Sequence, residues 1–123
     1  DSPCEFRRRP APVAGRTRAG GKLRALVFVG VLEVDVVLGD VHSLKGKRGV
    51  VRPVLAELRR RYDVSAAEAG HLDLHRRALI GVSVVAADAG HCREVLEACE
   101  RLVAARPELE ILSARQRFFG EED

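Results

Sequence analysis

The sequence predicts an α+β fold in which a four-stranded antiparallel sheet is covered on one face by two helices. In four segments, apolar residues alternate with other residues or form short runs, as they do in strands. Two longer segments repeat apolar residues every three or four positions, as amphipathic helices do. The order is strand, helix, strand, strand, helix, strand, and two helices can cover only one face of such a sheet.

The first strand is expected over residues 27–38, whose core face would carry Phe28, Gly30, Leu32, Val34 and Val36. Ser43 is a plausible N-cap for a helix that continues to Tyr62. Pro53 lies inside this helix. Because proline removes a backbone hydrogen bond, we expect a kink, or a break into two short helices, near Gly49.

The second half of the chain repeats this pattern. A short strand over 64–69, a polar loop over 70–76 and a strand over 77–87 lead to Asp88, a capping residue for the second helix. The apolar stripe of that helix contains Cys92, Val95, Leu96, Cys99, Leu102 and Val103. On its outer side, Glu97 is spaced to pair with Arg93 and Arg101. A final strand is expected over 108–117.

This order of elements is that of the ferredoxin-like split βαβ fold with right-handed crossovers. The sheet face away from the helices would remain open, and it is apolar enough that we expect a second subunit to cover it. The expected homodimer face includes Val29, Val31, Glu33 and Asp35.

The length and composition of the chain indicate a single domain. The 123 residues are 46% hydrophobic, enough for one core. Residues 1–26 are rich in Pro, Gly, Ala and Arg without periodicity, which predicts a disordered basic extension outside the native domain. The domain is expected over 27–118, followed by an acidic tail over 119–123. Residues 26–123 carry 14 basic and 16 acidic side chains, so a basic site on the domain must be local.

The first helix carries such a site. At about 100° per residue, Lys45, Arg48, Arg52 and Arg59 fall within roughly 60° of one another, and no acidic residue shares this stripe. Together with the helix N-terminus it favours an anion- or nucleic-acid-binding site. The alternative is a solvated face whose long side chains cover apolar surface. The candidate binding residues are Ser43, Lys45, Lys47, Arg48, Arg52 and Arg59.

Other chemistries have weaker support. Cys4, Cys92 and Cys99 lack metal-ligand spacing and indicate reduced thiols of a cytosolic protein. His71, Asp73 and His75 alternate as metal ligands can, but a polar hairpin loop contains the same residues, and we expect no metal or cofactor. No nucleophile with an orienting partner is identifiable, so we expect no enzyme. No stretch approaches the length of a membrane span.

Two other classes of protein with the ferredoxin-like fold do not match this sequence. An acylphosphatase needs an Asn near its Gly-rich loop, and this chain contains no Asn. An RNA-recognition motif stacks bases on aromatic residues of its central strands, where this sequence has only Phe28, predicted to point inward. RNA would therefore be bound through its phosphates, on the helix side.

Three motifs resemble the YlxP-like family, bacterial proteins without an assigned biochemical function. They are the run 28–35, the segment 42–48 with His42-Ser43-Leu44-Lys45, and the run 59–65 with Arg59-Arg60-Arg61-Tyr62. The resemblance covers about residues 27–117 and implies a ferredoxin-like fold. Genes of this family commonly lie beside those for translation initiation and ribosome maturation factors. In the loop 71–77 this chain keeps only Asp73, Leu74 and Arg77 of the family's Gln-Asp-Leu-Trp-Gln-Arg pattern.

These observations lead to two functional hypotheses. The first is a cytosolic, non-enzymatic binding domain that contacts ribosomal RNA or a ribosome-associated factor through the basic helix. The second is a regulatory domain that holds a small anionic metabolite at the same helix N-terminus. The dependence of affinity on salt separates them, because a polyanion releases many counterions and a small anion releases few.

Overall fold

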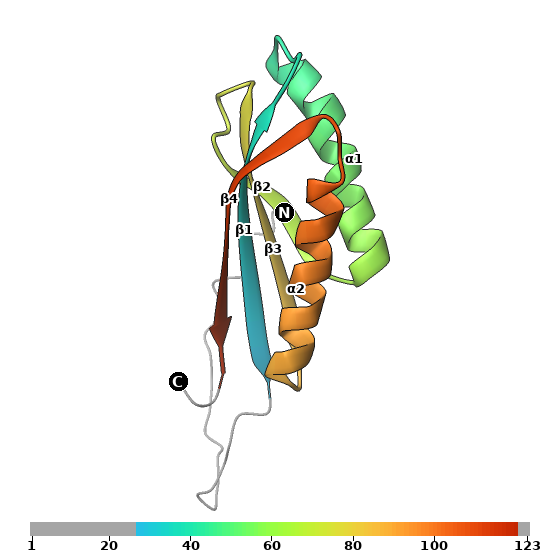
Figure 1. The fold of residues 1–123 in the computed structure, drawn as a ribbon, viewed down its shortest axis with the longest axis vertical. Helices are drawn as coiled ribbons and strands as arrows, with labels where there is room; N and C mark the ends of the chain where they lie inside the picture. Colours follow the sequence, from blue (N-terminus) through green and yellow to red (C-terminus); the bar gives the residue numbers. More distant parts are fainter. Residues whose placement is uncertain (1–26, 121–123) are drawn as a thin grey trace, which may run out of the picture.

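The computed structural model describes residues 27–120, which form one layer of sheet and one layer of helices (Figure 1). The strands are antiparallel throughout and follow the order β2-β3-β1-β4. This arrangement confirms the expected ferredoxin-like α+β fold. The elements are β1 (Phe28–Leu38), α1 (Leu44–Tyr62), β2 (Ser65–Gly70), β3 (Arg77–Ala86), α2 (Ala89–Ala104) and β4 (Leu109–Phe119).

Both helices lie on the same side of the sheet (Figure 1). Helix α2 packs across β1, β3 and β4, whereas α1 packs against the edge strand β2 and against α2. The two N-caps are as expected, because Ser43 accepts the amide of Gly46 and Asp88 accepts the amides of Gly90 and His91. The described part of the chain contains no helix of the length and apolarity that a membrane crossing requires.

The core lies between the sheet and the helices. Leu32, Val34 and Val36 of β1 are fully buried, as the alternation predicted. A Cβ at Gly30 would lie 2.9 Å from Leu96 Cδ1, so this glycine allows α2 to approach β1 closely. Burial raises the pKa of Cys99 to about 11, and this thiol therefore remains protonated and packs as a small apolar side chain.

Helix α1 runs without a break through Gly49 and Pro53, so the expected division into two helices is wrong. Val51 and Val54, on either side of the proline, are both buried in the core. Each buried valine contributes about 1.5–3 kcal/mol, whereas one backbone hydrogen bond contributes about 1 kcal/mol. The packing on both sides of Pro53 therefore holds the helix together.

Two other expectations need correction. Strand β4 continues to Phe119, one residue into the expected acidic tail, because Phe119 pairs with Val29. Within residues 27–120, no ion pair within 4 Å joins Glu97 to Arg93 or Arg101; the guanidinium of Arg93 lies instead 5.1 Å from the centre of the Phe118 ring. The expected disorder of residues 1–26 falls outside the described residues.

Candidate functional site

Three cations of the predicted basic stripe lie together on the surface of α1. Lys45, Arg48 and Arg52 are exposed and line a shallow hollow of about 600 Å³ with Gly49 and Pro53. Within the described part of the chain, no acidic group lies within 4 Å of any of these three charges. We call Lys45, Arg48 and Arg52 the cationic row.

The row lies on the side of α1 that faces away from α2. On the opposite side of the helix, Glu57 forms an ion pair with Arg106, which follows α2. On the side of the row, Arg59 donates a hydrogen bond of 2.8 Å to the carbonyl of Ala66 in the edge strand β2. The cationic row therefore occupies the outer flank of the molecule, above β2.

Lys47 does not belong to this surface. Its side chain is 2% exposed, and its Nζ donates to the carbonyls of His71, Leu74 and Arg77 at 2.9, 2.6 and 3.1 Å. The carboxylate of Glu68 lies 2.6 Å from the same nitrogen and balances its charge. Lys47 therefore joins α1 to the loop between β2 and β3, and it is not available to an external anion.

Two further predicted residues are partly engaged in the fold. The hydroxyl of Ser43 accepts the amide of Gly46 at 2.9 Å, which is the normal role of an N-cap. The guanidinium of Arg59 donates a hydrogen bond to one carbonyl of the edge strand β2. This bond also hinders a strand of another protein from pairing with that edge. The exposed and unpaired part of the predicted site is therefore the cationic row.

The loop held by Lys47 leads to a second charged cluster, on the face of the sheet opposite the helices. Arg77 Nη2 donates to both carboxylate oxygens of Asp35, at 2.8 and 2.9 Å, and His71 Nε2 lies 3.4 Å from the same carboxylate. The hydrogen bond from Arg77 holds the pKa of Asp35 below its usual value. Asp35 is thus ionised at neutral pH and fixed in place.

The expected dimer face is the open side of the sheet. Val29, Val31, Glu33 and Asp35 all point to this side and are half-buried. Glu33 lies 3.3 Å from Arg117 and 4.0 Å from Arg115, two residues that were not among those expected on this face. Their alternation along the final strand was the signal that could have placed them on this face.

His71, Asp73 and His75 do not line up as the alternation allowed. The amide of Leu74 bonds to the carbonyl of His71, so the backbone turns here instead of extending. Asp73 and His75 are exposed, whereas His71 reaches back to Asp35. Residues 27–120 contain no cluster of three or more His, Cys, Asp or Glu side chains that could hold a metal ion.

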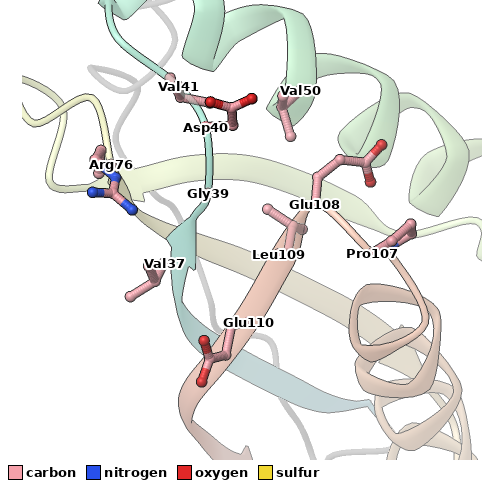
Figure 2. Close-up of a pocket in the computed structure, with 10 residues that line it drawn as sticks. All are labelled: Val37, Gly39, Asp40, Val41, Val50, Arg76, Pro107, Glu108, Leu109 and Glu110. Carbon is pink, nitrogen blue, oxygen red and sulfur yellow. The ribbon is translucent and has the colours of Figure 1, made fainter.

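A separate hollow of about 370 Å³ lies where β1 ends and β4 begins (Figure 2). Its walls carry Asp40, Glu108 and Glu110 together with Arg76. Figure 2 shows that the three carboxylates point in different directions, so they do not converge on one ligand. The excess of negative charge also makes this hollow unsuitable for the anion that the cationic row would bind.

Comparison with known proteins covers most of the residues that form this domain. The sequence model of a family described as "Protein of unknown function (DUF503)" matches residues 29–116. The uncharacterized protein YlxP of Bacillus subtilis (strain 168) is 26% identical over 92 residues, which cover 75% of this chain and all of that protein. The chain belongs to the DUF503 family of proteins, and its similarity to YlxP agrees with the expected YlxP-like family.

Proposed function

We propose that this protein is a non-enzymatic, cytosolic RNA-binding protein whose cationic row contacts phosphates of ribosomal RNA or of RNA in a ribosome-associated particle. One observation carries the proposal. Lys45, Arg48 and Arg52 project from one flank of α1 without an acidic partner in the described part of the chain, whereas the other cations of this helix are engaged in the fold.

The geometry of the row favours an extended anion. From Lys45 to Arg52 the helix rises about 10 Å, at about 1.5 Å per residue. A single phosphate is too small to contact the whole row, whereas successive phosphates of a nucleic acid backbone can do so. The hollow contains no aromatic side chain on which a base could stack, so we expect contacts that are independent of base sequence.

The alternative, a small anionic metabolite at the helix N-terminus, has less support. Such a ligand would use the Ser43 hydroxyl and Lys47, which already serve as the N-cap and the buried link to the β2–β3 loop. The gene neighbourhood implied by the resemblance to the YlxP-like family also favours a ribosomal partner over a metabolite.

The ionisable groups of the described part support a binding role. The pKa of Asp35 is lowered by Arg77, which does not suit a general acid or base that must exchange a proton near pH 7. Burial raises the pKa of both Cys92 and Cys99, so neither thiol supplies a thiolate nucleophile.

The proposal is tested by titrating the full chain with fluorescent RNA oligonucleotides of unrelated sequence over a range of salt concentrations. Three phosphate contacts predict similar affinities for all sequences and a slope of log affinity against log salt of about −2 to −3. A slope of about −1 would favour the small-anion alternative, and undetectable binding at low salt would contradict the proposal. Ribosomal particles should also carry the protein in sedimentation until ribonuclease is added.

A further inference from the structure

The sheet has an outer face, which we define as the side opposite the helices. Two apolar side chains are exposed on this face, at the end of the sheet where β3 and β4 terminate. Val85 is 65% exposed and Phe119 is 50% exposed. Further along β3 from Val85 the face is hollowed by about 330 Å³, between Leu79 and Val31 and over Gly81. We propose that a second copy of this chain covers the outer face and forms a homodimer in which sheet packs against sheet.

The charges of the outer face suit this occupant. Glu33 is already paired with Arg117 and Arg115, and Asp35 with Arg77, within each copy. Covering paired charges costs less hydration free energy than covering isolated ones. A face that combines apolar side chains with paired charges fits another face of the same kind. Its two carboxylates balance all but one of these three arginines, so it attracts an anion less strongly than the three unpaired side chains of the cationic row.

Gly81 supplies an independent reason. A glycine inside a strand destabilises it and often marks a site of close approach. For Gly30 the approaching group is Leu96 of the same chain, but a Cβ at Gly81 would meet only Ala69 Cβ at 3.4 Å and the Ala67 carbonyl oxygen at 3.9 Å, which are ordinary contacts. Nothing within residues 27–120 therefore requires glycine at position 81, whereas a partner that packs on the outer face would.

The strand register makes the face self-complementary. Val85 and Gly81 lie on the same side of β3, about 13 Å apart along the strand. A two-fold axis that lies between the sheets and crosses β3 at Ser83 places each Val85 over Gly81 of the other copy. Since Ser83 pairs with Val31, the two Val31 side chains meet on this axis.

The same axis brings together further compatible groups. Strand β4 is aligned with β1 so that Phe119 is opposite Val29 and Arg115 is opposite Glu33. The rotation therefore places Phe119 of one copy over Arg115 of the other, an aromatic ring against a cation. The Asp35 cluster lies near the edge of the area in which the two outer faces overlap, away from the axis.

Sedimentation equilibrium of the full chain, with Cys4→Ser to avoid adventitious disulfides, tests the dimer. We expect a dimer at tens of micromolar, and Val85→Asp should raise its dissociation constant about 100-fold or more, because both copies then bury an unpaired charge. Leu72→Asp is the matched control, since Leu72 is 62% exposed and lies in the loop between β2 and β3, away from the axis at Ser83. A monomeric parent, or a dimer that survives Val85→Asp, overturns the proposal.

A side-chain exchange tests the register. Gly81→Val fills the hollow and Val85→Gly removes the side chain that enters it, so each should weaken the dimer by about 10-fold or more. The double variant exchanges the two positions and should recover the parent affinity to within about 3-fold. Circular dichroism checks that all three variants fold. An unchanged dimer in Gly81→Val, or a folded double variant that remains monomeric, overturns the two-fold arrangement.

Discussion

Lys45 and Lys47 are two residues apart on the same helix and have opposite environments. Lys45 is exposed, has no acidic partner within the described part of the chain and belongs to the cationic row. Lys47 is buried against three carbonyls and one carboxylate. The difference arises because 200° of helix rotation separates them, which directs one side chain outward and the other toward the sheet. A cluster of cations in a sequence can thus combine a binding surface with a structural contact.

Of all these side chains, Lys47 should affect stability most when it is replaced by Met. Methionine keeps the volume of the side chain, but it leaves the Glu68 carboxylate and three carbonyls without their donor. Breaking a buried pair in this way costs about 3–5 kcal/mol. Urea unfolding should report this loss of stability for Lys47→Met, and it should report a change within about 0.5 kcal/mol for Lys45→Met. Equal effects of the two substitutions would contradict the assignment of separate roles.

The next largest loss of stability is expected for Asp35→Asn. Asp35 belongs to the charged cluster that includes His71 and Arg77, at the two ends of the loop held by Lys47. Loss of the charged hydrogen bonds to Arg77 should cost about 1–3 kcal/mol at neutral pH.

The pH dependence of this loss follows from the direction of the pKa shift. The folded pKa of Asp35 is lower than its unfolded value, so its contribution is present above the ordinary carboxyl pKa of 3.8 and is lost as the pH falls through the folded pKa. The difference in unfolding free energy between parent and Asp35→Asn should therefore shrink toward zero in acid. A difference that stays constant with pH would show that the ionised carboxylate is not its cause.

Arg59 should show an intermediate effect, because it is exposed but bonded to the edge strand. Arg59→Ala removes one hydrogen bond to the carbonyl of Ala66 and should cost about 1 kcal/mol. Hydrogen exchange in β2 should accelerate in this variant, while exchange in β4 should stay unchanged. If RNA affinity falls as far in Arg59→Ala as in Arg52→Ala, Arg59 is part of the binding surface as well.

The smallest effect on stability is expected for the cationic row itself. Replacing Arg48 and Arg52 by Gln should change the free energy of unfolding by less than about 0.5 kcal/mol, since both side chains are exposed and unpaired within the described residues. Thermal unfolding of the double variant beside the parent measures this change. A marked loss would mean that the row supports the fold.

The fold could be predicted from the sequence because it depends on local periodicity. Alternation placed Leu32, Val34 and Val36 in the core, and the side-chain caps Ser43 and Asp88 marked the helix starts. The site was predicted in part, since Lys45, Arg48 and Arg52 share one helical side.

Contacts between residues far apart in the sequence could not be predicted. The three acceptors of Lys47 lie 24 to 30 residues away, and no local pattern identifies them. Its position among Val54 and Leu58 on the helical wheel was the available sign that Lys47 points inward. The continuity of α1 through Pro53 likewise depends on core packing that only the assembled sheet supplies.

RNA binding by the cationic row is tested by measuring RNA affinity against salt for Arg48→Glu/Arg52→Glu and for a control with the same change of charge, Arg93→Glu/Arg101→Glu on α2. The first variant should bind all RNA sequences more weakly and should flatten the slope of log affinity against log salt by about 1.4–1.8, since two phosphate contacts are lost. The control should keep nearly the parent affinity and slope. Equal losses of RNA affinity in both variants would mean that only the net charge of the protein matters. No loss of affinity in either variant would contradict RNA binding by the cationic row.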